Sequence, residues 1–533
     1  MANTNHRSND NQHNNRDDGG DTTSFFCGGD TTGLFDGGHT TSLLPAFRSF
    51  DGSGNNVSNP TENTPGTGEA RLAPANFQPG TTDGLVDGPN PRTISNVVSS
   101  GPNADNIDPT GLSAMMYVWG QFIDHDLDRS PQGGSDISIT VPNGDPTLPD
   151  GSVIPLTRFL TSGGTAENDV TGWLDGSMIY GSDAATAASL RLPDGHLATS
   201  AGDNLPIVDG AFVAGDVRAT ENPDLTAITT LFYREHNHWV DTLHAEHPDW
   251  TGDQLYQMAR AIVVAEIENI TYSEFLPHLL GENALGSYDG YNAGTNARIT
   301  QEFSAAAFRL GHSIVSGTET KLATDGTTVL EEQSLADAFS DTPAQVETNG
   351  GVDALLRGIV HDNTQADDVY AVDELRNLLS DSPDVTDLIA IDVQRERDLG
   401  LGTLNQTREA LGLPKYMSFA QVTSDPTVAA HLQQVYGSVD NLDLFIGGLA
   451  EDHVNGGMVG STFETILIDQ FTALRDGDSF WWQNEPFDAQ TKQIIANRSL
   501  SDIIGDNTNT PNGVLPNDVF VVTPTQLTGT MNS

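Results

Sequence analysis

The pattern of apolar and polar residues along the chain predicts a mostly helical protein. Between residues 113 and 128, apolar side chains recur every three or four positions, which is typical of an amphipathic helix. The same spacing predicts further helices over residues 225–246, 252–280, 300–316, 370–380, 426–436 and 460–475. The second of these opens with the capping box Thr251-x-x-Gln254. Strand patterns are few and short, and no internal repeat is visible.

Long irregular connections are expected between these helices, because the chain contains 54 glycines and 27 prolines. Residues 1–40 are rich in Asn, Asp, Gly and Thr, so we expect a flexible, acidic and polar N-terminal tail. We expect a single large domain over residues 41–515 and a C-terminal tail over residues 516–533.

The net charge of −51 limits which partners the protein can bind. Such a surface repels phosphate backbones and anionic lipids, so we expect neither nucleic-acid nor membrane-surface partners. No stretch approaches the 18 consecutive apolar residues of a membrane span. Dissolved salt screens self-repulsion of this kind, which favours a marine or halophilic source. An ordinary acidic secreted protein remains the alternative.

Cysteine usage and the start of the chain bear on the cellular compartment. Cys27 is the only cysteine, so an intrachain disulfide is excluded. The first twenty residues are polar and contain no apolar core of a signal peptide. We expect a protein that acts outside the cell after export by a route without a visible signal peptide, and a cytoplasmic location stays open.

One predicted helix carries three polar side chains on a single face. Gln121, Asp124 and His125 stand at positions i, i+3 and i+4 of the 113–128 helix. Burying such a triplet is costly unless each group meets a partner, so the pattern indicates a site. A hydrogen-bonded structural cluster or a metal site of some kind explains the same spacing.

Two further segments carry candidate chemistry. Residues 171–177 place oxygen atoms at alternate positions, from Thr171, the Trp173 carbonyl, Asp175 and Ser177. A hard cation such as Ca²⁺ is bound by oxygens of these types, although a surface turn rich in Asp and Ser is the simpler explanation. In the 300–316 helix, His312 shares a face with Phe308 and Arg309, and a lone histidine on such a face is usually a core residue.

Taken together and in this order, the segments resemble the animal-type haem peroxidases of the peroxidase–cyclooxygenase superfamily. The resemblance covers residues from about 45 to 510. It rests on residues 48–56, 90–96, 119–128, 171–182, 218–237, 300–313, 389–398, 442–451, 459–463 and 474–482. It implies a mostly α fold in which a haem b-derived group lies between central helices, with long loops and few short strands.

On the distal side of that haem, the resemblance gives each residue a role. His125 would be the distal base, because an imidazole titrates near neutral pH and can take a proton from peroxide and return it to the departing oxygen. Arg218, which alone would indicate a surface salt bridge, would stabilise negative charge as the O–O bond breaks. Gln121 would orient a distal water or a halide. Asp124 and Glu221 would form ester links to the haem.

On the proximal side, the resemblance makes His312 the axial iron ligand. Arg309 and Arg395 would bind haem propionates. The family usually has Asn where this chain has Asp392, which would accept a hydrogen bond from His312. Because a carboxylate accepts more strongly than an amide, we expect His312 to gain imidazolate character and the ferric/ferrous potential to fall.

The resemblance also gives the 171–177 loop a metal. Asp126 would complete a Ca²⁺ shell with Thr171, the Trp173 carbonyl, Asp175 and Ser177. We expect the bound ion to hold Asp126, and through it the neighbouring His125, at a fixed depth over the iron.

The implied activity is reduction of hydrogen peroxide and oxidation of bromide, iodide, thiocyanate or phenolic donors through a ferryl intermediate. Asn222 stands where the chlorinating member has a methionine bonded to haem, so chloride oxidation is not expected. A fatty-acid dioxygenase would need a tyrosine at position 309, which is an arginine here. A non-catalytic adhesive or matrix protein on the same scaffold would lose the distal pair or the axial ligand, and neither is lost.

Overall fold

The computed structural model describes residues 46–81, 84–101, 106–162, 164–379 and 385–522. The tail expected over residues 1–40 lies outside this part of the chain. Helices dominate the described residues, and the strands are short antiparallel pairs, as the sequence predicts. None of the described helices is both long enough and apolar enough to cross a membrane.

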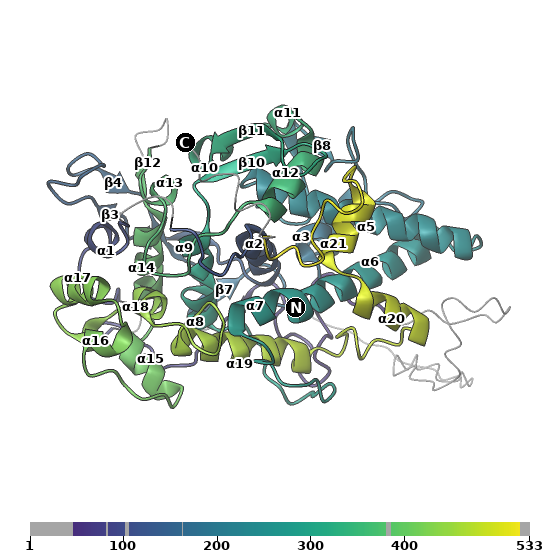
Figure 1. Cartoon of the computed structure of the whole chain (residues 1–533). Helices are drawn as coiled ribbons and strands as arrows, with labels where there is room; N and C mark the ends of the chain where they lie inside the picture. Colours follow the sequence, from purple (N-terminus) through teal and green to yellow (C-terminus); the bar gives the residue numbers. More distant parts are fainter. Residues whose placement is uncertain (1–45, 82–83, 102–105, 163, 380–384, 523–533) are drawn as a thin grey trace, which may run out of the picture.

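Three long helices form the centre of the protein: α2 (Met115–Leu127), α5 (Pro223–Glu246) and α6 (Gly252–Ile270). Figure 1 shows α2 in the middle, with α5 and α6 side by side on one side and α14 (Leu388–Asp398) on the other. Trp119 and Phe122 of α2 contact Phe232 of α5, and the Phe122 and Phe232 rings stack with their centroids 5.4 Å apart. This aromatic contact fixes α2 within the core.

The remaining helices surround this centre. The longer ones are α1 (Pro91–Val98), α12 (Gly351–His361), α17 (Pro426–Tyr436), α19 (Ser461–Gly477), α20 (Ala489–Asn497) and α21 (Leu500–Asn507). The shorter ones are α3 (Ser177–Tyr180), α4 (Ala184–Leu190), α7 (Leu276–Leu280), α8 (Gln301–Ser304), α9 (Gly311–Ile314), α10 (Leu335–Ala338), α11 (Pro343–Val346), α13 (Asp373–Arg376), α15 (Leu404–Ala410), α16 (Phe419–Val422) and α18 (Leu444–Ala450).

The largest sheet among the described residues has three strands in the order β1 (Thr67–Gly68), β7 (Thr165–Asn168) and β6 (Thr161–Ser162). The other strands form two-stranded pairs: β2 (Gln132–Asp136) with β5 (Thr157–Phe159), β3 (Ile139–Thr140) with β4 (Val153–Ile154), β8 (Ile207–Val208) with β9 (Ala211–Phe212), β10 (Thr318–Leu322) with β11 (Val329–Ser334), and β12 (Leu378–Leu379) with β13 (Val385–Thr386).

Local sequence signals explain where several helices begin. The capping box predicted at the start of α6 is present, because Thr251 and Gln254 exchange side-chain and backbone hydrogen bonds. Asn222 caps α5 by accepting from the Leu225 N–H, and Pro223 follows at the first helical position. The helices predicted at 113–128, 225–246, 426–436 and 460–475 are confirmed as α2, α5, α17 and α19.

Three helix predictions need correction. The 300–316 helix is divided into α8, a 3₁₀ turn (Ala307–Leu310) and α9, because the backbone of Ala306 leaves the helical region at φ −138° and ψ −70°. The helix predicted at 370–380 is limited to α13, after which the chain forms β12. The 252–280 helix contains one π-helical turn, Thr271–Phe275, between α6 and α7.

The end of the chain also differs from expectation. Val519 and Phe520 fall in the segment expected to be a C-terminal tail, yet both are fully buried. The Ser113 N–H donates to the Phe520 carbonyl at 2.8 Å, and the Phe520 ring meets Trp119 edge-on. Residues up to 522 therefore pack against the start of α2 as part of the core.

Candidate functional site

The distal residues predicted from the sequence lie together beside α2. His125 Nε2 is 3.7 Å from a carboxylate oxygen of Glu221, and the side-chain amide of Gln121 donates to the same oxygen at 3.4 Å. Asn222 donates to the Gln121 carbonyl oxygen at 3.0 Å, which fixes the orientation of the Gln121 amide. The structure thus joins one face of α2 to the segment just before α5.

Arg218 is held rigidly against the C-terminal end of α2. Its guanidinium forms a double hydrogen bond with Asp216, at 2.9 and 2.8 Å, and donates to the carbonyls of His125 and Asp128 at 3.0 and 2.9 Å. Among the described residues, these four contacts leave one N–H of Nη1 without a partner. Because its side chain is only 17% exposed, Arg218 is not part of a surface salt bridge.

The proximal residues form a second, tightly bonded group. His312 Nδ1 lies 2.7 Å from one oxygen of Asp392, and Arg309 donates to the other oxygen at 2.7 Å. Burial alone would raise the pKa of Asp392, but the charges and hydrogen bonds of His312 and Arg309 lower it overall, so the carboxylate is ionised. None of the described hydrogen bonds uses Nε2 of His312, and this side chain is 30% exposed.

The helices that carry the distal and proximal histidines pack against each other. Helix α2 lies against α9, which carries His312. Burial lowers the pKa of His125 well below 6.5, and the positive charges of Arg218 and His312 lower it further. Burial raises the pKa of Asp124 to about 7, against the opposing charges of Arg218 and His312. Charges from two segments far apart in the sequence, Arg218 and His312, therefore both act on His125.

Arg395 of α14 carries a buried donor that is available to a bound anion. Its guanidinium packs on the Phe159 ring at 3.9 Å and donates to the Thr157 carbonyl through Nη1. Nη2 is buried and has no hydrogen-bond partner among the described residues. A buried guanidinium N–H without an acceptor is costly, so this atom suits the carboxylate of a bound group. The donor set as a whole fits a haem bound through a histidine.

The 171–177 loop wraps around the side chain of Asp126. The backbone N–H groups of Asp175, Gly176 and Met178 donate to the Asp126 carboxylate at 3.0, 3.1 and 3.0 Å. Ser177 Oγ donates to the Asp126 carbonyl at 3.0 Å. The structure thus brings the 171–177 loop and Asp126 into direct contact, as the sequence predicts.

Asp175 of this loop and Asp126 of α2 place two carboxylates close together. Burial and the nearby charge of Asp126 together raise the pKa of Asp175 to about 8. One Asp175 oxygen accepts from Thr171 at 2.9 Å, while the other is buried without a partner among the described residues. Trp173 is fully buried in the same loop, and none of the described hydrogen bonds uses its carbonyl.

Within the described ranges, no group of three or more His, Cys, Asp or Glu side chains is close enough to bind a metal ion. The 171–177 loop and Asp126 of α2 instead offer two carboxylates together with hydroxyl and carbonyl oxygens. An all-oxygen set of this kind is the type that binds Ca²⁺ rather than a transition metal.

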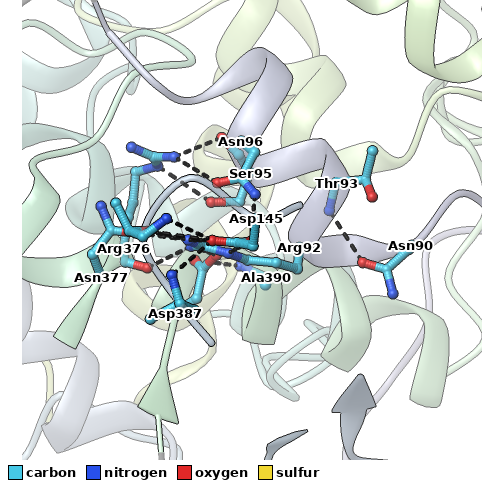
Figure 2. A network of polar contacts seen from close by, with 12 residues as sticks. Asn90, Arg92, Thr93, Ser95, Asn96, Asp145, Arg376, Asn377, Asp387 and Ala390 are labelled. Atoms are coloured by element: carbon cyan, nitrogen blue, oxygen red, sulfur yellow. Dashed lines mark hydrogen bonds and ion pairs between the residues drawn. The ribbon is translucent and has the colours of Figure 1, made fainter. Parts of the chain in front are cut away.

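Sequence reasoning missed the contacts that hold α14 in place. Figure 2 shows Arg92, at the start of α1, bonded to Asp145 at 2.8 and 3.0 Å and to Asp387 at 2.7 Å. Asp387 also caps α14 by accepting from the Ala390 N–H. Since α14 carries both Asp392 and Arg395, the buried Arg92 network positions the proximal side of the site. Asp216, which clamps Arg218, was missed as well, although its position two residues earlier was a usable signal.

Comparison with known proteins agrees with this geometry. The chain matches the animal haem peroxidase family over residues 47–520. It is 31% identical to peroxinectin A of Dictyostelium discoideum, over 88% of this chain and 95% of the relative. It is also 31% identical to human myeloperoxidase, over 89% of this chain and 73% of the relative.

Solved structures show the same relationship. Peroxidase A from Dictyostelium discoideum superposes with a TM-score of 0.80 at 28% identity, covering 90% of this chain and all of that one. A fatty acid alpha-dioxygenase from Oryza sativa shares the fold, with a TM-score of 0.78 at 21% identity over 89% of this chain and 87% of that one. With the family matched across most of its length and relatives that are named peroxidases, the chain belongs to the animal haem peroxidase family and is a peroxidase.

Proposed function

We propose that this peroxidase reduces hydrogen peroxide with His125 and Arg218 and oxidises bromide, iodide, thiocyanate or phenolic donors. The observation that carries the proposal is that helix α2, which carries His125, packs against α9, which carries His312. His312 is hydrogen-bonded through Nδ1 to an ionised Asp392, which leaves its Nε2 available, and the charge of His312 contributes to the lowered pKa of His125.

The residues present would hold a haem between His125 and His312. His312 Nε2 would bind the iron, and the unpaired Nη2 of Arg395 would bind a propionate, with Arg309 beside it. When bound, the haem supplies the two-electron redox chemistry that cleaves the O–O bond of peroxide. The chain contributes orientation, proton transfer and charge stabilisation.

Proton transfer would fall to His125. Burial lowers its pKa, so the imidazole is neutral at neutral pH and can accept a proton from peroxide. The protonated ring can then return that proton to the departing oxygen. Arg218, fixed by Asp216, keeps one N–H free to stabilise the negative charge that develops on the same oxygen.

Two carboxyl groups would attach the haem covalently. Burial raises the pKa of both Asp124 and Glu221. Glu221 lies within reach of His125 and Gln121, so it lines the distal space. Mass spectrometry of peptides after acid-acetone extraction tests the ester links: haem retained on the peptides containing Asp124 and Glu221 supports them, and complete extraction contradicts them.

We propose Ca²⁺ as the ion of the 171–177 loop. Support comes from the unpartnered oxygen of Asp175, the nearby Asp126 carboxylate, and the hydroxyl groups of Thr171 and Ser177. The Trp173 carbonyl would complete the set. Bound Ca²⁺ would remove the repulsion between the two carboxylates and lock the loop onto the end of α2.

A dioxygenase activity is the alternative raised by the shared fold. In this chain the position three residues before His312 is Arg309, whose guanidinium is bonded to Asp392. A tyrosyl radical cannot form there, so fatty-acid oxygenation by that route is not proposed.

The test is a donor panel on the purified haem-loaded protein. We expect a Soret band, peroxide-dependent oxidation of iodide and guaiacol, and loss of about 10²–10⁴ in rate for His125→Ala. An intact Soret band without turnover of either donor would contradict the proposed function.

A further inference from the structure

A second pocket opens at the surface, and none of its lining residues belongs to the haem site. It has a volume of about 300 Å³ and lies where the π-helical turn, α7 and the segment after α19 meet. Its walls include Tyr272, Tyr288, Trp481, Trp482 and Arg475. We call it the aromatic pocket. The Tyr272 ring meets Trp481 edge-on with centroids 4.7 Å apart, and Tyr288 lies 6.0 Å from Trp481 on the other side.

A continuous line of aromatic contacts leads from this pocket to the proximal side of the haem site. The Tyr272 ring contacts Phe471 of α19 at 6.0 Å, and Phe471 contacts Phe308 at 5.4 Å. We call Tyr272, Phe471 and Phe308 the ring chain. Phe308 lies in the 3₁₀ turn that runs directly into α9, which carries His312. Each step is an edge-on ring contact, and beyond the half-buried Tyr272 both rings, Phe471 and Phe308, are buried.

The backbone is distorted at the point where the ring chain begins. Tyr272 belongs to the π-helical turn Thr271–Phe275. Its hydroxyl donates to the Phe471 carbonyl at 2.6 Å, which ties this turn to α19. π-Helical turns interrupt α-helices mostly at functional positions. In this turn Tyr272 lines the pocket and also contacts the buried Phe471.

The chemistry of the two outer rings favours Trp481 as the group that loses an electron. An oxidised tyrosine must release its phenolic proton, and the Tyr272 hydroxyl faces only a backbone carbonyl, which cannot take it. An oxidised indole can retain its N–H as a radical cation. The Trp481 N–H donates to the Gln483 side-chain oxygen at 3.2 Å, which stabilises that charge. The phenylalanine rings serve as the medium through which the electron passes.

The pocket suits a small neutral phenol. Its walls offer aromatic faces for stacking, and the Tyr288 hydroxyl is buried without a partner among the described residues, so it can bond a ligand hydroxyl. The one guanidinium among its lining residues, that of Arg475, donates to Asp476 and to the Gly286 carbonyl. Glu282 also lies in the walls, so this pocket suits a neutral phenol better than an anionic one.

We propose that the aromatic pocket binds small neutral phenols and that Trp481 relays their electrons through the ring chain to the proximal side; this rests on the proposed peroxidase function. Each phenol gives one electron to oxidised Trp481 and its hydroxyl proton to solvent, leaving a phenoxyl radical. Two phenols thus supply the two electrons that, together with two protons, convert one hydrogen peroxide into two waters.

The first test locates the radical without measuring turnover. Haem-loaded protein is treated with hydrogen peroxide and the nitrone spin trap DMPO in the absence of a donor, and adducts are mapped by peptide mass spectrometry. We expect adducts on the pocket residues Trp481 or Tyr288, suppressed by added guaiacol and lost in Trp481→Phe. They should persist in the control Trp250→Phe, a half-buried tryptophan that stacks on His247 outside the pocket. Wild-type protein without adducts in the pocket would overturn the proposal.

The second test uses guaiacol as the bound probe. Calorimetric titration of the haem-loaded protein, without peroxide, should detect binding that is lost when Leu285→Trp fills the pocket. The ratio of guaiacol to iodide kcat/KM should fall at least about fivefold in Trp481→Phe and stay constant in Trp250→Phe. An unchanged ratio would overturn the relay. Failure of the proposed function looks different, because wild-type protein would then oxidise neither donor despite an intact Soret band.

Discussion

Replacing Arg92 with Met tests whether the buried network of Figure 2 holds the proximal helix in place. Arg92 and its two partners, Asp145 and Asp387, have side chains with no solvent exposure. The substitution leaves two buried carboxylates without their cation. Removing one partner of a buried ion pair costs about 3–5 kcal/mol. A full cost for each carboxylate is not expected, because Asp145 keeps the N–H groups of Thr147 and Leu148 and Asp387 keeps that of Ala390.

We therefore expect Arg92→Met to lower the free energy of unfolding by about 3–5 kcal/mol at pH 7. Urea unfolding followed by far-ultraviolet circular dichroism measures the change. The control Lys415→Met removes an ion pair with Glu409 in which both side chains are exposed, and it should cost under about 1 kcal/mol. A loss for Arg92→Met no larger than that of the control would refute the reasoning.

The stability difference between wild type and Arg92→Met should also depend on pH in a definite direction. Burial opposes ionisation of Asp145, but hydrogen bonds from Arg92 and from backbone N–H groups hold its pKa well below the usual value. Asp145 therefore adds stability above its unfolded pKa of about 3.9, and that stability is lost as the pH falls towards the folded pKa. Without Arg92 this contribution is largely gone. The difference between wild type and Arg92→Met should shrink below about pH 4, and a difference that grows on acidification would contradict this explanation.

Three further predictions concern the haem site. Asp392→Asn should raise the ferric/ferrous potential by on the order of 60 mV, because the amide accepts a weaker hydrogen bond from His312. Spectroelectrochemistry measures the potential, and a value that does not rise contradicts the role assigned to Asp392. Asp216→Asn should slow the stopped-flow reaction with peroxide about 10–100-fold with an unchanged Soret band, since Arg218 loses its clamp; an unchanged rate would mean that Arg218 needs none. Chelation of Ca²⁺ should lower the melting temperature of wild type but not of Asp175→Asn, and equal lowering in both would remove the 171–177 loop as the binding site.

Much of the helical fold can be predicted because local signals and tertiary packing agree. Helices α2, α5 and α19 each bury an apolar face, and α5 and α6 begin at standard caps. The 300–316 segment shows the opposite case. Its run of three alanines favours a continuous helix, yet the chain breaks at Ala306. In the resulting turn, Arg309 donates to the Ser304 carbonyl and to Asp392, and these contacts come from packing that periodicity does not encode.

The candidate site could be predicted to a similar extent. Motifs indicated His125, Arg218 and His312, because each lies in a segment whose residue types and spacing resemble a known family. The buried partners that fix them could not be predicted in the same way. Arg92, Asp145 and Asp387 come from three separate segments, and nothing in the local pattern of any one segment points to the other two. The contact of Phe471 with Phe308 is hidden for the same reason.

Resonance Raman spectroscopy of the ferrous haem-loaded protein tests the central claim most directly, namely that His312 binds the iron opposite His125. An iron–histidine stretching band should be present in wild type and in His125→Ala. It should disappear in His312→Gly and return as an iron–imidazole band when imidazole is added. A His312→Gly protein that binds haem with an unchanged iron–histidine band would contradict the account.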